Sequence, residues 1–412
     1  MRSFFLCFTL LMSFVSLFAQ QGRDARLQKR AEKLAHKFII VDGHVDLPWR
    51  LKKSNFRLTR EYIGIPVESS EGDFDYVRAK KGGLDAPFMS IFIPARHQET
   101  GDAKEVADTL IDMVRGIARA HPDKFALALS PADIERNFKR GLLSLPMGME
   151  NGAPIGEDLD NVDYFHQRGI RYITLTHSRD NQICDSSYDT TRTWNGLSPF
   201  GQQVVRRMNQ VGIMVDISHV SDSAFWQVMD ITRAPCIASH SSCRYFTPAF
   251  ERNMNDDMIR RLAQNGGVIM INFGSSFLDE NVRLKRDSLR SVLRKQLQER
   301  GIESMDDPAA REFIRQFQQA HQKELFADVQ KVADHIDHVV QLVGVDHVGL
   351  GSDFDGVGDS LPTGLKDVAA YPNLIAELLR RGYSRKDIRK ICSGNVLRVW
   401  RQVERIAQAS QP

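Results

Sequence analysis

Short apolar segments alternate with amphipathic segments along most of this chain. The apolar segments have the length of β-strands and lie near residues 39–46, 88–94, 142–149, 170–177, 213–219, 235–240, 267–273 and 348–353. Amphipathic helical patterns follow most of them, for example AKEVADTLIDMVRGIARA and SPFGQQVVRRMNQVG. Eight such units predict a parallel sheet closed into a (β/α)8 TIM-like barrel. An open doubly wound sheet is the alternative, but the chain has no glycine-rich dinucleotide fingerprint.

Residues 279 to about 331 break this alternation. The segment is highly charged, and its apolar positions follow a helical period, with one stripe at Leu289, Val292, Leu293 and Leu297. We therefore predict a helical insertion within a single catalytic barrel domain over residues 21–412. A helical hairpin packed on the outside of the barrel is one interpretation, and a lid or a subunit contact is the other.

The first 20 residues, MRSFFLCFTLLMSFVSLFAQ, differ from the rest. They contain one charged residue, Arg2, then an apolar run and a small residue, Ala19, where a signal peptidase could cleave. This pattern predicts a secretory signal peptide, 1–20, and an exported protein that is periplasmic or secreted. The polar C-terminus lacks the hydrophobic tail of a lipid-anchor signal, so we expect no membrane anchor in the mature chain.

Composition narrows the possible partners. Hydrophobic residues make up 42% of the chain and charged residues 26%, which is ordinary for a globular protein with a large core. The formal net charge is only +3, and no arginine–aromatic stripe is present, so we expect no nucleic-acid partner. Four cysteines outside the signal segment do not make a disulfide scaffold, and Cys184 has no obvious partner.

Polar residues with metal-binding chemistry stand at the ends of the predicted strands. In KFIIVDGHVDLPWR, His44 and Asp46 are two residues apart, so in an extended segment both side chains point to the same side. Such a pair alone is weak evidence for a metal site, because an ordinary hydrogen-bonded pair on the surface is the simpler interpretation. Later strands, however, end in Glu150, His177, His219, His240, and the pair Asp353 and Asp355.

The conjunction of these residues favours a metal centre. Four of the chain's 12 histidines stand at strand ends, with carboxylates beside them, on the face of a (β/α)8 barrel that carries the chemistry. Imidazoles and carboxylates that arrive from separate strands suit a pair of divalent ions, and a ligand set without thiolate favours zinc, with manganese or cobalt possible. Two such ions can hold a hydroxide nucleophile. We find no convincing serine-nucleophile elbow.

These segments also resemble one known family. The motifs DGHVDLP, GMENG, LTHS, DISHVS, SHSS, ERNMNDDMI, GLGSDFDGV, YPNLIAELLRRGYS and SGNVLRVW are similar, in content and order, to those of the membrane dipeptidase (renal dipeptidase) family of dinuclear zinc peptidases. The resemblance runs from about residue 38 to 405. It implies two Zn2+ ions per chain, held by five ligands: His44 and Asp46 on the first ion, Glu150 bridging both, and His219 and His240 on the second.

The same resemblance implies roles for three further residues. Asp353 matches the family's acid/base residue beside the bridging hydroxide, and His177 matches the histidine that contacts the substrate near its scissile carbonyl. Arg252 matches the arginine that binds the terminal carboxylate of the substrate, although an exposed arginine at a helix start would explain it equally well.

The resulting hypothesis is an exported zinc dipeptidase that hydrolyses dipeptides by a metal-bridged hydroxide. The resemblance further implies tolerance of a D-residue on the carboxyl side, and a homodimer. One alternative is another amidohydrolase-type reaction on the same metal site, such as hydrolysis of an N-acyl amino acid, a β-lactam or a lactone. A binding protein without catalytic activity is a third possibility, against which the complete set of ligands argues.

Overall fold

The structure is a computed structural model that describes residues 22–54, 67–302 and 310–410. The predicted signal peptide, 1–20, lies outside the described residues. Within the described ranges every helix is too short or too polar to cross a membrane.

Eight parallel strands form one sheet, and their order in the sheet is the same as their order along the chain. They are β1 (Val41–Val45), β2 (Ala86–Phe92), β5 (Met147–Glu150), β6 (Ile170–Thr174), β7 (Met214–Asp216), β8 (Ile237–Ser241), β9 (Val268–Ile271) and β10 (Val348–Leu350). The sheet closes between β1 and the residues after β10, where the Asp353 N–H donates to the His44 carbonyl at 3.1 Å and the Asp46 N–H to the Phe354 carbonyl at 2.8 Å. The predicted (β/α)8 barrel is confirmed.

One predicted strand is wrong in its extent. Residues 142–149 form two strands, since β4 (Leu143–Leu145) ends before Pro146 and pairs with β3 (Phe125–Leu127) in a separate two-stranded sheet. Proline has no N–H to donate to a ladder, so the chain leaves one sheet at this residue and enters the barrel as β5. Strands β6 and β7 also end earlier than predicted, which places His177 and His219 on the loops that follow.

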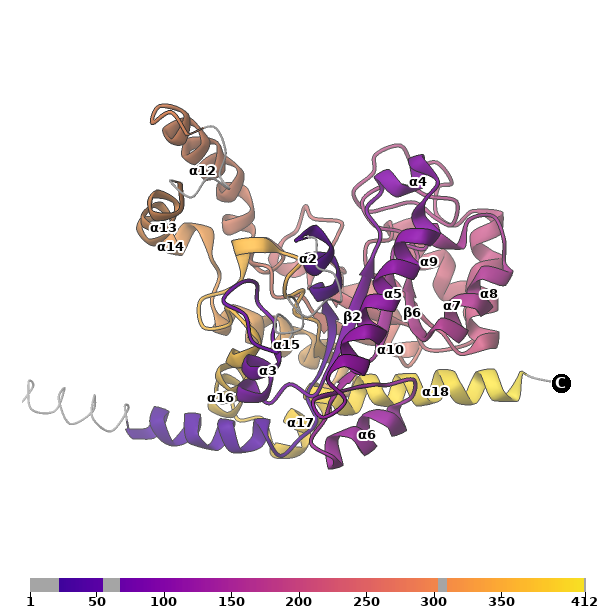
Figure 1. Cartoon of the computed structure of the whole chain (residues 1–412), viewed down its shortest axis with the longest axis horizontal. Helices are drawn as coiled ribbons and strands as arrows, with labels where there is room; N and C mark the ends of the chain where they lie inside the picture. Colours follow the sequence, from indigo (N-terminus) through magenta and orange to yellow (C-terminus); the bar gives the residue numbers. More distant parts are fainter. Residues whose placement is uncertain (1–21, 55–66, 303–309, 411–412) are drawn as a thin grey trace, which may run out of the picture.

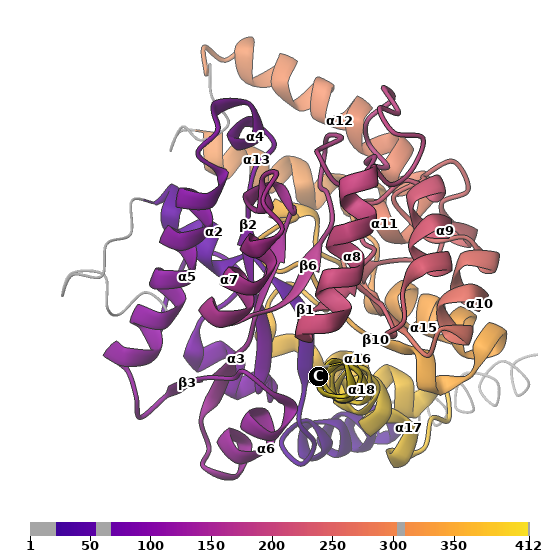
Figure 2. The ribbon, with the colours of Figure 1, turned by 90° about the vertical axis from the view of Figure 1, so that its right-hand side faces the viewer.

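Helices surround the barrel (Figure 2). Those that follow the strands in the chain are α2 (Leu47–Lys53), α5 (Ala103–Ala120), α7 (Asp160–Arg168), α8 (Pro199–Val211), α9 (Asp222–Ile231), α10 (Asp256–Gln264), α15 (Val329–Val343) and α16 (Tyr371–Arg380). Several begin with side-chain caps; for example, Ser198, Ser221 and Asn255 accept hydrogen bonds from the first turns of α8, α9 and α10. The caps fix where each loop at the strand ends stops and its helix begins.

The last helix, α18 (Asn395–Ala409), closes the end of the barrel at which the strands begin. Its fully buried Trp400 shares an apolar cluster with the first residues of four strands, Val41, Ala86, Ile237 and Val268. Figure 1 shows α18 running across this side of the molecule. Because one end is filled by the helix, chemistry is left to the end at which the strands finish.

The charged insertion forms a helical arm. It contains α12 (Glu280–Gln298), α13 (Ala310–Ala320) and α14 (Gln322–Leu325), and it stands away from the barrel in Figure 1. Leu293 and Leu297 from α12 pack with Ala310 and Phe317 from α13 in a small apolar cluster of their own. Val292, which the sequence pattern assigned to the buried stripe, is instead 45% exposed.

Candidate metal centre

Glu150, the last residue of β5, lies at the centre of the predicted ligands. Its Oε1 is 3.0 Å from His219 Nε2 and 3.2 Å from His240 Nε2, while its Oε2 is 3.3 Å from His44 Nε2. His44 Nε2 is in turn 3.4 Å from Asp46 Oδ2. The five predicted ligands are all buried, and the two oxygens of one carboxylate face two separate groups of ligand atoms.

The backbone around these residues is unusual. His219, Asp353, Asp355 and Asn151, which directly follows Glu150, all have φ between 65° and 82°. Residues other than glycine seldom adopt this left-handed conformation, and where they do they gather at functional sites. Each one follows a barrel strand. His219 and Asp353 belong to the centre themselves and Asn151 follows Glu150, whereas Asp355 pairs with Arg50.

Hydrogen bonds fix the tautomers of two histidines. The Tyr172 hydroxyl donates to the Gly43 carbonyl at 3.0 Å, so at 2.9 Å it accepts the proton of His44 Nδ1. In the same way Ser239 Oγ donates to Asp216 and accepts from His240 Nδ1 at 2.7 Å. In both histidines Nε2 is left with its lone pair directed at the centre, which is the arrangement of a metal-ligating imidazole.

The electrostatics of the centre favour a cation. Burial lowers the pKa of His219 and of His240 well below the ordinary value, which keeps both rings neutral. Burial also lowers the pKa of His44, but Tyr172, Glu150 and Asp46 raise it by more and leave it well above its ordinary value. Positive charge is therefore favoured at His44 Nε2, and a metal ion supplies it as well as a proton does.

The residues present fit divalent metal ions. His44 Nε2 and Asp46 Oδ1 are buried without a hydrogen-bond partner among the described residues. His219 Nε2 and His240 Nε2 are 2.9 Å apart, close to the roughly 3.3 Å that separates two ligands placed tetrahedrally at 2.0–2.1 Å from zinc. Three overlapping groups bring one ligand atom per residue within 4.8 Å: His44, Glu150 and His240; Glu150, His177 and His219; and His44, Asp46 and Asp353.

Two supporting residues were missed from the sequence. Tyr172, in the middle of β6, fills the barrel beneath His44. Its ring packs directly against Gly148, where a Cβ would lie only 1.9 Å from the Tyr172 Cζ, so a larger residue would not fit there. Asn272, just after β9, donates to Asp353 Oδ2 at 2.8 Å. Both stand beside apolar strand residues, so no local pattern distinguishes them from the core.

Asp353 and its neighbour Asp355 have different surroundings. Burial, with help from Asp46 and Glu150, raises the pKa of Asp353 to about 7 despite the opposing effect of His44 and the hydrogen bond from Asn272. Asp355 instead forms an ion pair with Arg50 at 2.9 Å and accepts the Asp73 N–H at 2.6 Å. Asp353 alone of the two is turned toward the metal ligands.

His177 and Arg252 border the ligands in different ways. His177 Nε2 is 3.7 Å from Glu150 Oε1, and its ring contacts those of Phe92 and His219 at 4.7 and 4.3 Å. Arg252 is only 3% exposed and donates to Ser241 Oγ at 2.7 Å and to the His240 carbonyl at 2.8 Å. The alternative interpretation of Arg252 as an exposed arginine at a helix start is wrong.

An open cavity of about 880 Å3 leads to the centre. Asp46, Glu150, His177, His219 and Asp353 form its inner wall, and Tyr188 and Phe277 line it farther along. Arg252 does not line the cavity, but it stacks at 5.4 Å on the ring of Phe277 and lowers the pKa of the already buried His219. A small substrate in this cavity would contact the metal ligands and lie close to a buried guanidinium.

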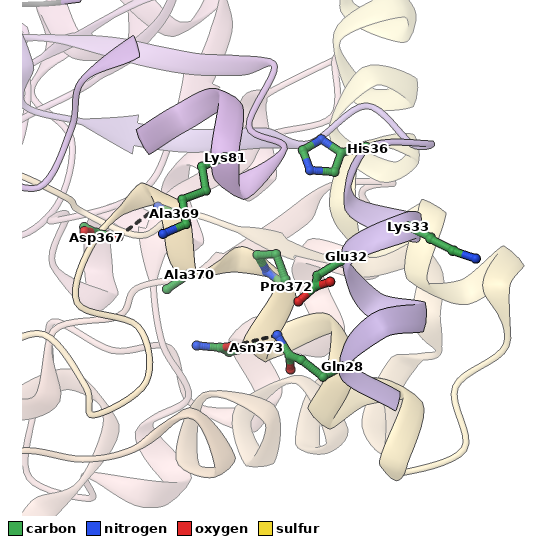
Figure 3. A pocket seen from close by; sticks show the side chains of 10 residues that line it. All are labelled: Gln28, Glu32, Lys33, His36, Lys81, Asp367, Ala369, Ala370, Pro372 and Asn373. Atoms are coloured by element: carbon green, nitrogen blue, oxygen red, sulfur yellow. Dashed lines mark hydrogen bonds between the residues drawn. The ribbon is translucent and has the colours of Figure 1, made fainter. Parts of the chain in front are cut away.

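A second cavity, of about 800 Å3, lies between the helix over residues 22–35 and the start of α16 (Figure 3). Gln28 on that helix donates across it to Asn373 at 3.1 Å. His36 and Lys81, which also line it, come just before β1 and β2, so this cavity is near the end where the strands begin. Chemistry in (β/α)8 barrels is found at the opposite end.

A parallel eight-stranded barrel whose strand ends gather histidines and carboxylates defines a metal-dependent hydrolase. The family model described as membrane dipeptidase (peptidase family M19) matches residues 28–412, and the chain belongs to this family. It is thus a metal-dependent dipeptidase, a hydrolase that acts on peptide bonds.

Individual relatives agree with this assignment. An uncharacterized dipeptidase of Schizosaccharomyces pombe is 31% identical over 391 residues, which cover 92% of this chain and 84% of the relative. The crystal structure of the probable dipeptidase PvdM from Pseudomonas aeruginosa is 29% identical with a TM-score of 0.77, covering 93% of this chain and all of that one. A metallopeptidase from Rhodobacter sphaeroides, crystallised with a phosphinate mimic of the dipeptide L-Ala-D-Ala, is 25% identical with a TM-score of 0.72, covering 89% and 99%.

We expect Tyr172→Phe to weaken metal binding about 10- to 100-fold, because His44 Nδ1–H loses its acceptor and the ring is no longer held in the ligating tautomer. Titration with a competing chelator measures the effect. Tyr383→Phe is the matched control. The Tyr383 hydroxyl also donates a hydrogen bond, to Asp337 at 2.6 Å, but this pair is not part of the centre. Equal metal affinity in the two variants would show that Tyr172 only fills space.

Proposed function

We propose that this chain is an exported dipeptidase that hydrolyses its substrate with two zinc ions. The observation that carries the proposal is that the two oxygens of the Glu150 carboxylate have different partners. Oε1 faces His219 and His240, and Oε2 faces His44. A carboxylate with separate partners on its two oxygens is suited to bridge two ions. His44 and Asp46 would complete one site, and His219 and His240 the other.

When bound, the two ions would supply a hydroxide nucleophile and polarise the peptide carbonyl. Asp353 is suited to take the proton of that nucleophile and return it to the leaving amine, because its carboxyl group lies among the predicted ligands and burial raises its pKa above the ordinary value. The Asn272 amide holds Asp353 Oδ2 and leaves Oδ1 free for this transfer.

His177 would steady the substrate carbonyl. Burial lowers the pKa of His177, so the ring is neutral and can donate one hydrogen bond. Its Nε2 stands near Glu150 at the inner wall of the cavity. A donor at this position stabilises the negative charge that develops on the carbonyl oxygen in the transition state.

Arg252 would select short substrates by binding their terminal carboxylate. Its Nε is buried and has no hydrogen-bond partner among the described residues, so the guanidinium has a donor to spare. Tolerance of a D-residue on the carboxyl side is supported by the Rhodobacter sphaeroides relative, whose ligand mimics L-Ala-D-Ala. Export rests on the sequence of residues 1–20, and the homodimer on the family resemblance.

Hydrolysis of L,L- and L,D-dipeptides by protein of known metal content tests the proposal. We expect about two zinc ions per chain, cleavage of both dipeptide types, and complete loss of activity on chelation. An N-acyl amino acid, a β-lactam and a lactone serve as rival substrates. Faster turnover of one of these, or full activity in metal-free protein, would overturn the proposal.

Asp353→Asn should lower kcat by about 10²–10⁴-fold, because the amide cannot accept the proton, while metal content stays near that of the parent. Steady-state kinetics and metal analysis on the same preparation measure both. If the variant works at the parental rate, proton transfer does not pass through Asp353. Asp355→Asn would then be the variant to examine, although its pairing with Arg50 argues against it.

Arg252→Ala should reduce kcat/KM on dipeptides about 10- to 150-fold, since a hydrogen bond to a charged group contributes about 1.5–3 kcal/mol. On a dipeptide amide, which lacks the negative charge, parent and variant should be almost equally poor. The difference between the two losses isolates carboxylate binding. Equal losses on acid and amide would mean that Arg252 only supports the loop through Ser241 and His240.

A further inference from the structure

The helical arm supplies part of the wall of the active-site cavity. Arg286 and Arg290 of α12 line it together with residues 357–360, which follow β10. The two arginines are one helical turn apart, so their side chains are neighbours on the helix surface. The mouth of the cavity is therefore built partly by the insertion.

Among the described residues, one carboxylate, that of Asp359, forms an ion pair with either of these two arginines. The Arg286 side chain is 16% exposed, and its one hydrogen bond with a described residue goes to Asp359 Oδ1 at 3.2 Å. Arg290 is exposed and has no hydrogen bond or ion pair with any described residue. Burial lowers the pKa of Arg286, and the neighbouring Arg290 lowers it further against the opposing effects of Asp359 and Asp287.

Other arginines of the same region are arranged differently. Arg283, three residues before Arg286 on the same helix, forms two hydrogen bonds with Glu280 at 2.7 and 2.8 Å. Like charges one turn apart on a helix repel each other, and Asp359 offsets the charge of only one of the two arginines at the cavity. Lys53 at the end of α2 lines the same cavity and adds a third positive charge.

We propose that Arg286 and Arg290 bind an anionic group of the substrate and so direct the enzyme toward dipeptides with an acidic side chain. This inference rests on the proposed dipeptidase function and adds a substrate class to it. The terminal carboxylate, common to all dipeptides, is assigned to Arg252, whose guanidinium stacks on the ring of Phe277. The arginines of the arm are then available for a second carboxylate, the one in the side chain of an acidic residue of the substrate. Glutamate carries this group and glutamine does not.

Matched substrates provide the test. The ratio of kcat/KM for Glu-Ala to that for Gln-Ala, and for Ala-Glu to Ala-Gln, compares a carboxylate with a neutral side chain of the same shape. We expect the zinc-loaded parent to favour the acidic member of at least one pair by about 10-fold, from one partly buried charge-assisted contact. The pair that shows the preference identifies the side of the substrate that the arm reads.

Three variants follow this ratio. Arg286→Gln should reduce it about 10-fold, and the exposed Arg290→Gln about three-fold. Asp359→Asn should raise it, because the carboxylate that competes for Arg286 is removed. Arg294→Gln is the matched control: it lies one further turn along α12, is exposed and does not line the cavity, so both its activity and its ratio should equal those of the parent.

The outcomes separate this inference from the function on which it rests. If all four dipeptides are hydrolysed but the ratios stay near one in parent and variants, the inference is overturned and the dipeptidase function stands. An Arg294→Gln effect as large as that of Arg286→Gln would also overturn it, since a diffuse field of the arm would then be responsible. Failure to hydrolyse any dipeptide would overturn both.

Discussion

A buried carboxylate with too little positive charge around it is the constraint on which this site depends. Glu150 is 3% exposed, and an ionised carboxylate in such a place is costly unless it is paired. Burial raises its pKa, but His44, His177 and the contacts with His219 and His240 hold it well below the ordinary value. Three of these imidazoles, His177, His219 and His240, are themselves kept neutral by burial, so metal cations are the natural source of the missing charge.

Closure of the barrel brings a third carboxylate, that of Asp353, to the centre beside Asp46 and Glu150. His44 and Asp353 are 309 positions apart in the sequence, yet the backbone bond from Asp353 to His44 makes them neighbours. Asp42 reinforces the same seam, since its buried carboxylate accepts the N–H groups of His44 and Ser352 and the hydroxyl of Tyr371 on α16. A substitution that weakened these hydrogen bonds would therefore move Asp353 away from the predicted ligands, although neither Asp353 nor any ligand had been replaced.

The order of the strands was predictable because strands buried on both faces read as continuous apolar runs. The limits of the strands were harder to predict. Pro146 divides one apparent apolar run between two sheets, and the ends of β6 and β7 depend on how these strands pair with each other. The predicted ligands do come together, since polar residues after apolar runs share one end of a parallel barrel.

Other parts of the site had no local signal. Tyr172 looks like a core residue in the sequence. The need for glycine at position 148 becomes visible only in the structure, where the Tyr172 ring leaves no space for a side chain. The burial of Arg252 follows from contacts with Ser241 and His240, whose positions are set by β8. Arg286 and Arg290 lie in a charged helix that reads as solvated, and only the path of the arm past the cavity distinguishes them from its other charges.

The arm and the barrel divide the work of the enzyme. The arm has its own apolar cluster, so its surface can change without disturbing the strands that hold the centre. It is tied to the residues after β10 through Asp359, which accepts hydrogen bonds from Arg286 and from Gln318. Positive charge on the cavity wall and a buried guanidinium beside the centre would attract a substrate that carries carboxylates. In the proposed mechanism, the carboxylates that would bind the metals are thus separate from the cations that would select the substrate, so a change in one set need not alter the other.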